Sequence, residues 1–443
     1  MSVTDTPFTP LDESLRRLDA AVSQLVGVVR QTVTTMHAPD ETPLPNCASE
    51  LAPTLRTLDA PTVEFGSGAH PNPAQARAAA IGEALERYSA AFVPEGRVHV
   101  ATTRELGAAA VPPSRFGLFH PCQYADPGFP FTPFTADTPT SFVEGMSLAD
   151  GSAALVPAEL VYLRPPAAGT RPIAFATSSG LACGPSFMEA ARAGLLELVE
   201  RDAVMVAWSN RLSLPLLTWD GDREVEWLDR RFFAVTGLRY SVVDASALLD
   251  VPVALGVLHG PPASRAALAV GAGCAARMPD AWLKALSEAF GVYRWLGLQR
   301  EVEPRRPLPR EEEVRTFDDH MLFYATHERA QRAAFLDGSD LRTTLAAARP
   351  LTGITPREQI DAVLERLERH GVSAYAVDVT SPDVESLGLR VVRVVAPELC
   401  ALDVAQSARF LGCRRLYTAA FDAGLARAVL EPADLNDDPH PFP

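Results

Sequence analysis

Two long helices with well-marked starts, both carrying the same motif, constrain the fold of this chain most strongly. The first is predicted within residues 70–92, where Asn72 is a good N-cap, Pro73 suits the first helical position and Gln75 completes a pair that resembles a capping box. The second is predicted within residues 185–208, with Ser186 as the N-cap and Glu189 three residues later.

The segments beyond the second helix alternate between helical and strand-like patterns. Helices are predicted over 280–298 and 360–369, and strands over 251–258, 265–270, 373–379 and 389–395. This alternation indicates an α+β (mixed α/β) fold in which mixed sheets are flanked by helices. The 443 residues are enough for one large domain or for two intimate ones.

The two ends of the chain differ from its middle. Residues 1–60 open with an amphipathic helical pattern from Leu15 to Leu25 and then loosen into a proline-rich stretch. Residues 431–443 are polar and proline-rich, with no core of their own. We therefore predict an N-terminal helical and loop segment over 1–60, a main domain over 61–430 and a tail over 431–443.

Composition excludes several classes of protein. The formal charge is −15, from 40 basic against 55 acidic residues, which is the opposite of what a broad nucleic-acid-binding surface needs. The chain has no run of 18 apolar residues, which excludes a transmembrane helix, and its start does not resemble a signal peptide. The six cysteines form no CxxC pair, so we interpret them as reduced core thiols. We expect a soluble, cytoplasmic protein with no nucleic-acid or membrane partner.

Lysine use limits the kinds of nucleotide site that the chain can build. Its single lysine is Lys284, and no glycine-rich loop of the form GxxxxGK[ST] precedes it, so a Walker-type P-loop is absent. If the protein handles ATP, arginines and metal-bridged carboxylates must hold the phosphates.

The motif shared by the two helices is ExxER. Glu83, Glu86 and Arg87 form the first copy. Glu197, Glu200 and Arg201 form the second. Positions i, i+3 and i+4 share one helix face, so each copy presents two carboxylates and a guanidinium together. Two such faces could converge on a magnesium–phosphate group, because Mg²⁺ prefers carboxylate oxygens and arginine binds phosphate bidentately.

A plainer interpretation of the same residues stays open. An ExxER face is commonly a solvated surface with weak ion pairs between residues four apart. Glu189, which falls on roughly the same side as the second motif, could be only the second half of a capping box. We interpret His320 and His327 as surface or supporting groups, because an isolated histidine is usually structural.

The two helices resemble the paired signature segments of the YcaO family, ATP-dependent enzymes that activate peptide-backbone amides. The pattern AxxxExxER from Ala79 to Arg87 is similar to the family's first segment. TSSGLACG over 177–184, then Glu189 and ExxER, are similar to the second. The likeness extends from about residue 60 to the end, and PHPFP over 439–443 is similar to the PxPxP tail of azoline-forming cyclodehydratases.

The resemblance implies a reaction, two cofactors and a set of site residues. A Cys, Ser or Thr side chain of a ribosomally made precursor peptide would attack the preceding amide carbon, and ATP would phosphorylate the resulting oxygen. Loss of phosphate would leave a thiazoline or oxazoline. The implied Mg²⁺ ligands are Glu83, Glu86, Glu197 and Glu200, and the implied ATP-binding residues are Ser67, Arg87, Glu189, Arg201, Glu288 and Arg294. In the tail, the resemblance assigns catalytic roles to Pro439, Pro441 and Pro443, the last through its terminal carboxylate.

The resemblance also implies partners and leaves alternatives. No segment is similar to the ubiquitin-activating-enzyme-like (ocin-ThiF-like) domain that binds leader peptides, so we expect a separate leader-binding protein and a homodimer within a larger complex. Other YcaO proteins make thioamides or macrocyclic amidines. Four positions depart from the family pattern, which allows a catalytically inactive scaffold, and these are Ala79, Ser67, Ser179 and Pro185.

Overall fold

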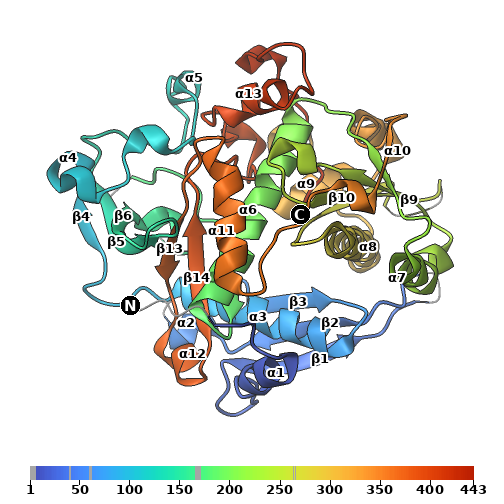
Figure 1. Cartoon of the computed structure of the whole chain (residues 1–443), viewed down its shortest axis with the longest axis horizontal. Helices are drawn as coiled ribbons and strands as arrows, with labels where there is room; N and C mark the ends of the chain where they lie inside the picture. The colour runs from blue at the N-terminus through green and yellow to red at the C-terminus, as the bar shows by residue number, and fades with distance from the viewer. Residues whose placement is uncertain (1–5, 39–40, 59–61, 165–170, 263, 265) are drawn as a thin grey trace. The chain divides into compact units, whose positions relative to one another are not determined.

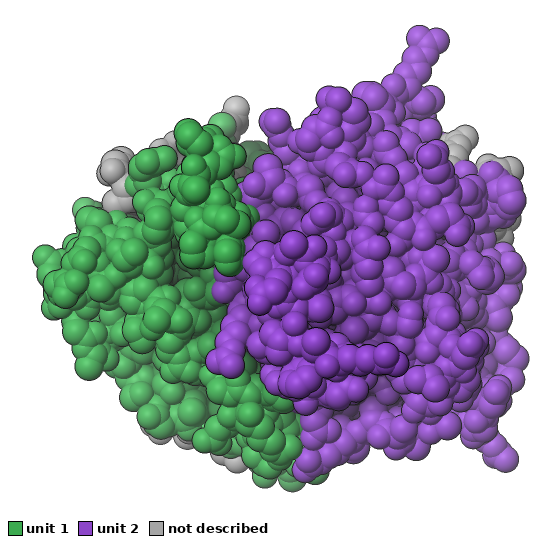
Figure 2. Space-filling model, turned by 90° about the horizontal axis from the view of Figure 1, so that it is seen from above, with its two compact units in different colours: residues 1–36, 45–198, 352–398 green, residues 37–44, 199–351, 399–443 purple. Residues whose placement is uncertain are grey.

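The computed structural model describes residues 6–38, 41–58, 62–164, 171–262, 264 and 266–443. The chain forms two compact units, each built from several stretches of sequence (Figure 2). Unit 1 comprises residues 1–36, 45–198 and 352–398, and unit 2 comprises residues 37–44, 199–351 and 399–443. These units follow a different division from the three parts expected above, and that division stays a prediction.

Unit 1 contains a three-stranded antiparallel sheet against which a long helix packs (Figure 1). Its strands are, in order across the sheet, β1 (Val29–Thr35), β2 (Asn46–Leu51) and β3 (Phe65–Ala69), and the helix is α3 (Pro73–Ala91). The packing is close, because a Cβ added to Gly68 would lie 2.3 Å from the carbonyl oxygen of Ala76. The prediction of a loose stretch before residue 60 is therefore wrong for β1 and β2, which pair as antiparallel strands.

The first predicted helix is shorter than its pattern. Helix α1 (Leu11–Asp19) ends before Leu25, whose side chain is 94% exposed. The two long helices start where predicted. The side chain of Asn72 accepts a hydrogen bond from Ala74 at the start of α3, and the hydroxyl of Ser186 accepts one from the amide of Glu189 at the start of α6 (Phe187–Ser209).

A six-stranded sheet forms the rest of the framework of unit 1. Its strands are β4 (His99–Ala101), β5 (Thr140–Ser147), β6 (Ala153–Pro157), β7 (Leu181–Gly184), β13 (Tyr375–Asp378) and β14 (Arg390–Val395). The order is β4-β5-β13-β14-β7, with β6 paired to β5. The strands predicted at 373–379 and 389–395 are thus confirmed, and the core includes Leu181, Val377 and Val391 from three of these strands.

Unit 2 contains a five-stranded sheet covered by α8 (Met278–Val302), which packs along β10 and β11 (Figure 1). The strands are β8 (Leu216–Thr218), β9 (Arg239–Asp244), β10 (Val253–His259), β11 (Leu268–Cys274) and β12 (Arg342–Thr344), in the order β11-β10-β9-β8-β12. The strand predicted from residue 265 begins at Leu268, and Arg265 lies outside the described residues. No helix in the described part of the chain is long and apolar enough to cross a membrane.

The C-terminal segment corrects two expectations. It was expected to have no core, yet Phe442 is 0% and His440 1% exposed. Of the two alternatives for His320, a surface or a supporting group, the surface position is wrong, because His320 is fully buried and its ring stacks on that of His440 with centroids 3.9 Å apart. The cysteines are free thiols, but Cys122 is exposed rather than part of a core.

Candidate active site

The first ExxER motif is hydrogen-bonded to the neighbouring strand β3. Glu83 accepts hydrogen bonds from the amide and hydroxyl of Ser67, at 2.5 and 3.2 Å. Its other oxygen lies 2.6 Å from Nη2 of Arg87, which also donates to the carbonyl of Phe65. Two predicted ATP-binding residues and one predicted metal ligand therefore lie together, and the Glu83–Arg87 pair has the i,i+4 spacing of the plainer interpretation.

Glu86, one turn further along α3, lies in a more enclosed position. It accepts a hydrogen bond from the amide of Cys183 in β7 at 2.8 Å. Burial is the main cause that raises its pKa to about 8, and the nearby carboxylates of Glu83 and Glu197 add to this, against the Cys183 hydrogen bond and Arg87. The charges of these three carboxyl groups repel one another, so positive charge nearby would be favourable.

Glu197 and its surroundings are positioned by a buried arginine. Glu197 accepts a hydrogen bond from the amide of Gly180 at 3.1 Å. Gly180 has a φ of +82°, which favours glycine, and a Cβ there would lie 2.5 Å from a carbonyl oxygen. Arg393 donates to the carbonyls of Thr177 and Ser179, and to that of Val161 at 3.0 Å.

Arg393 was missed by the sequence analysis. It is 2% exposed, and burial lowers its pKa to about 10, while the charges of Glu197 and Glu86 oppose that shift. The available signal was an arginine with two valines on either side of it in the strand segment LRVVRVV. This buried cation holds the TSSG loop through the carbonyls of Thr177 and Ser179 and is itself anchored to that of Val161, so we interpret Arg393 as a positioning residue.

Glu189 is held by the N-terminal segment of the chain. Its Oε1 accepts hydrogen bonds from the hydroxyls of Thr9 and Ser186, at 2.8 and 3.1 Å. The guanidinium of Arg192 lies over the ring of Phe8, 5.3 Å from its centroid. The predicted ATP-binding carboxylate is therefore partly engaged by residues of its own chain.

In unit 2, the second ExxER motif faces the single lysine of the chain. Glu200 is 1% exposed, and its Oε2 accepts hydrogen bonds from the amide of Cys274 and from Nζ of Lys284, both at 2.8 Å. No functional role was predicted for Lys284 from the sequence, where it served only to exclude a P-loop. The signal that could have placed it in the site is its position one helical turn before Glu288 on α8.

Glu288 joins the same group. It accepts a hydrogen bond from the amide of Ala272 in β11. Burial is the largest cause that raises its pKa to about 7, with repulsion from Glu200 adding to it, while Arg201 and Lys284 lower it. Predicted residues Glu200, Arg201 and Glu288 thus lie close together.

Arg294, the remaining predicted ATP-binding residue of unit 2, has a different neighbour. It lies six residues beyond Glu288 on α8, where its Nε forms an ion pair with Glu41 at 3.3 Å. Its predicted role in ATP binding stays a prediction.

The C-terminal segment is anchored beside Arg201 by several side chains. Nη1 of Arg201 donates to the main-chain oxygen of Pro443 at 2.7 Å. The hydroxyl of Tyr324 donates to the carbonyl of Pro439 at 2.6 Å, and the indole of Trp208 donates to that of Asp438 at 3.0 Å. The tail segment is therefore fixed along its length, which its composition alone did not suggest.

The donor set suits a hard divalent cation. The described residues contain no preformed cluster of three or more His, Cys, Asp or Glu side chains that could hold a metal ion. The pKa of Glu86 is raised mainly by burial and further by two neighbouring carboxylates, so positive charge near this group would be favourable. The predicted ligands divide between unit 1, with Glu83, Glu86 and Glu197, and unit 2, with Glu200. The four-ligand Mg²⁺ set therefore stays a prediction.

Solved structures share this fold. A heterocyclase in complex with substrate and cofactor matches 100% of this chain with a TM-score of 0.81 and 23% identity. This chain spans only 59% of that heterocyclase's length. A YcaO protein from Methanopyrus kandleri, bound with AMPPCP and Mg²⁺, matches 90% of this chain and 94% of its own, with a TM-score of 0.63 and 20% identity. A chain of the E. coli microcin synthetase McbBCD complex matches 83% of this chain and 88% of its own, with a TM-score of 0.55 and 14% identity.

A family model gives the assignment. The model described as YcaO cyclodehydratase, ATP- and Mg²⁺-binding, matches residues 28–400, which include both ExxER motifs and the strands and helices that hold them. The match agrees with the carboxylate and arginine groups found on α3 and α6 and with the fold shared with heterocyclases. This chain belongs to the YcaO cyclodehydratase family, whose members bind ATP and Mg²⁺.

Proposed function

We propose that this protein is the catalytic subunit that converts Cys, Ser or Thr residues of a ribosomally made precursor peptide into thiazolines or oxazolines, with ATP as co-substrate. The observation that carries the proposal is the buried PHPFP segment, which brings the main-chain oxygen of Pro443 to within 2.7 Å of Arg201 in the second ExxER motif. A proline-rich segment suits this role because its extended conformation is largely preformed.

The proposed chemistry needs ATP because an amide oxygen is a poor leaving group. Phosphorylation of that oxygen turns it into phosphate, which departs as the ring forms. Phosphoryl transfer relies mainly on positioning and on neutralising charge, and bound Mg²⁺ would supply part of that neutralisation. We assign Mg²⁺ to Glu83, Glu86, Glu197 and Glu200. Ser67, Glu189, Glu288 and Arg294 are proposed ATP contacts, with Arg87 and Arg201 binding phosphate oxygens.

The tail has two proposed tasks in this scheme. Arg201 fixes the last residue of the PHPFP segment, and Pro439 and Pro441 stiffen the backbone that leads to it. A carboxylate at Pro443 would then accept the proton that the attacking thiol or hydroxyl loses, and the guanidinium beside it keeps that carboxylate ionised until then.

We further propose that a separate leader-binding protein of the ubiquitin-activating-enzyme-like (ocin-ThiF-like) class delivers the peptide. A structural neighbour of this chain is part of the multi-protein McbBCD complex, which supports a shared assembly of this kind. Homodimerisation within that assembly is part of the same proposal.

A non-catalytic scaffold is the second candidate function. The observation that favours it is that the motif residues pair with one another, Glu83 with Arg87 and Glu200 with Lys284, as purely structural ion pairs would. YcaO enzymes that make thioamides or amidines share the ATP chemistry, and they differ from an azoline-forming enzyme in the nucleophile that attacks the amide and therefore in the product.

One experiment separates the catalytic proposal from the scaffold. The protein is incubated with its leader-binding partner, the precursor peptide, ATP and Mg²⁺, and the peptide is analysed by mass spectrometry. The proposal requires the loss of one water for each ring formed, and Glu200→Gln should abolish it. The matched control is Glu303→Gln, an exposed carboxylate of unit 2. Water loss that survives Glu200→Gln would contradict the site, and sulfur incorporation would indicate thioamide formation.

A further inference from the structure

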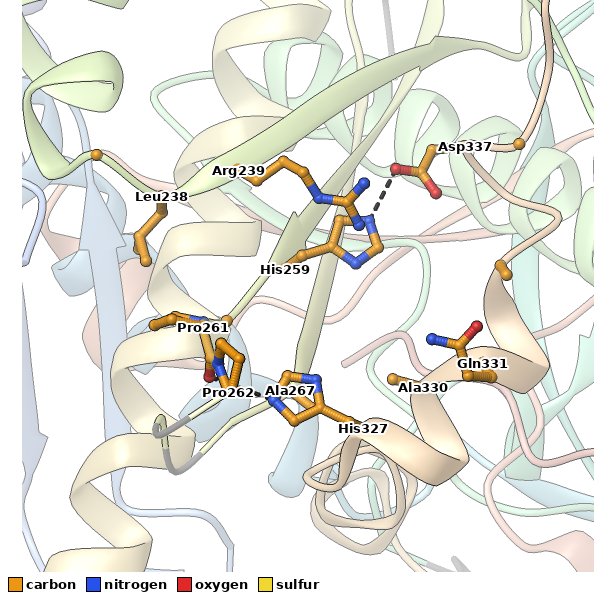
Figure 3. A pocket seen from close by; sticks show the side chains of 14 residues that line it. Leu238, Arg239, His259, Pro261, Pro262, Ala267, His327, Ala330, Gln331 and Asp337 are labelled. Carbon is orange, nitrogen blue, oxygen red and sulfur yellow. Dashed lines mark hydrogen bonds and ion pairs between the residues drawn. The ribbon is translucent and has the colours of Figure 1, made fainter.

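Unit 2 contains a cavity that shares no residue with the proposed active site (Figure 3). Its volume is about 620 Å³, within the range of small-molecule sites. It lies where β9 begins and β10 ends, and it is closed on another side by α10 (His327–Ala330) and the turn that follows. Its polar lining residues are Arg239, His259, His327, Gln331 and Asp337.

The sheet register explains why a guanidinium and an imidazole meet in this cavity. Arg239 on β9 is the direct cross-strand partner of His259 on β10. Side chains alternate along a strand, so Ser241, two residues after Arg239, lies on the same face. Asp337 connects the two strands, because its Oδ2 accepts hydrogen bonds from Ser241 at 2.7 Å and from Nε2 of His259 at 2.8 Å.

The charges in the cavity favour an anion. Among the described residues that line the cavity, Asp337 is the only acidic one, and it already accepts two hydrogen bonds. Burial would raise the pKa of Asp337, but the hydrogen bonds from His259 and Ser241, together with the electrostatic attraction of His259 and Arg239, outweigh it and the pKa is lowered. This carboxylate is therefore ionised and paired. Arg239 and Gln331 are exposed, and neither side chain has a hydrogen-bond or ion-pair partner among the described residues.

We propose that this cavity binds a compact oxyanion, either a carboxylate or a phosphate group of a small molecule. Arg239 supplies the planar guanidinium that binds such groups through two parallel hydrogen bonds. Gln331 adds an amide donor. His259 uses Nε2 to donate to Asp337, which keeps that carboxylate paired. The site is independent of the proposed catalytic function, since it uses none of the ExxER or tail residues.

Calorimetry of the intact protein with two probes, citrate and inorganic phosphate, tests the proposal. Binding in the millimolar range or tighter is expected, with at least a tenfold loss in Arg239→Gln and a smaller loss in Arg239→Lys, which keeps the charge but not the bidentate geometry. The matched control is Arg305→Gln, which removes the same charge from an exposed position of unit 2 outside the cavity.

The outcomes distinguish specific binding in this cavity from nonspecific electrostatic attraction to the protein surface. Tighter binding of citrate would identify a carboxylate ligand, and tighter binding of phosphate would identify a phosphate ligand. The proposal is overturned if neither probe binds at millimolar concentration, or if Arg305→Gln weakens binding as much as Arg239→Gln does. Circular dichroism of each variant would establish that it is folded before titration.

Discussion

Nη1 of Arg201 donates a hydrogen bond to the main-chain oxygen of Pro443 at 2.7 Å, which joins the second ExxER motif to the PHPFP segment. The segment reaches this position because Phe442 is fully buried and Tyr324 holds Pro439. A predicted ATP-binding arginine and a predicted catalytic tail thus contact each other directly within unit 2.

Removing the end of the tail should abolish turnover without unfolding the protein. Deletion of Pro443 alone takes away the contact with Arg201 but retains Phe442, so we expect at least a tenfold loss of peptide cyclisation with little change in melting temperature. Phe442→Ala is the contrasting variant. It empties a buried site and should cost ~3–5 kcal/mol of unfolding free energy. Full turnover by the Pro443 deletion, in a peptide mass assay, would refute the tail's role.

Acid should loosen the anchoring of the tail. Burial is the main cause that lowers the pKa of His440 to about 3, and it also holds the pKa of His320 well below its ordinary value. Between pH 6.5 and about 3 the unfolded chain binds protons that these folded histidines do not, so stability falls as pH falls through this window.

Denaturant titrations at pH 7 and pH 5 measure that effect. We expect the loss of unfolding free energy between the two values to be smaller in His440→Gln, which cannot titrate, than in the wild type. His99→Gln replaces an exposed histidine of unit 1 and should behave like the wild type. An identical loss in all three proteins would show that the stacked pair contributes nothing to the pH dependence.

Glu86→Gln should weaken the binding of ATP with Mg²⁺ while leaving the stability of the protein nearly unchanged. The pKa of Glu86 is raised to about 8, chiefly by burial, so a neutral side chain of the same shape suits this position. We expect the unfolding free energy at pH 7 to change by less than ~1 kcal/mol, because a glutamine keeps an acceptor for the Cys183 amide. Binding of ATP with Mg²⁺ should weaken at least tenfold, and Glu95→Gln, at an exposed position, is the control. Unchanged binding would remove Glu86 from the proposed ligand set.

Thr9 should compete with the nucleotide for Glu189. Thr9→Val keeps the shape of the side chain and removes the hydroxyl that donates to Glu189 at 2.8 Å. If Glu189 binds ATP, this variant should bind ATP several-fold more tightly, which corresponds to about 1 kcal/mol for one hydrogen bond. Ser14→Ala, which removes a local hydrogen bond of the same segment, should have no effect. Weaker binding by Thr9→Val would instead mean that Thr9 positions Glu189.

Local signals in the sequence were sufficient to predict the long helices and several strands. Asn72 and Ser186 mark helix starts that the structure contains, because a capping side chain acts on amides within the next few residues. The two ExxER faces follow from helical periodicity alone. Family membership rested on these same residues and is confirmed by the family model.

Contacts between distant segments could not be predicted in the same way. β1 and β2 were interpreted as loose chain because a strand's stability depends on its partners rather than on its own propensity. The PHPFP segment looks polar and unstructured until His320 and Tyr324 provide the surface that buries it. Lys284 and Arg393 were missed because their roles depend on which carboxylates and carbonyls the fold brings near them.

Calorimetry of the isolated protein with ATP and Mg²⁺, beside Glu200→Gln and the exposed control Glu303→Gln, tests the central claim most directly. The account predicts saturable binding by the wild type and the control, and its loss in Glu200→Gln. If binding appears only after the leader-binding partner and the peptide are added, the site is completed by the assembly. Binding that Glu200→Gln leaves intact, or no binding even in the full assembly, would contradict an ATP site at the ExxER motifs.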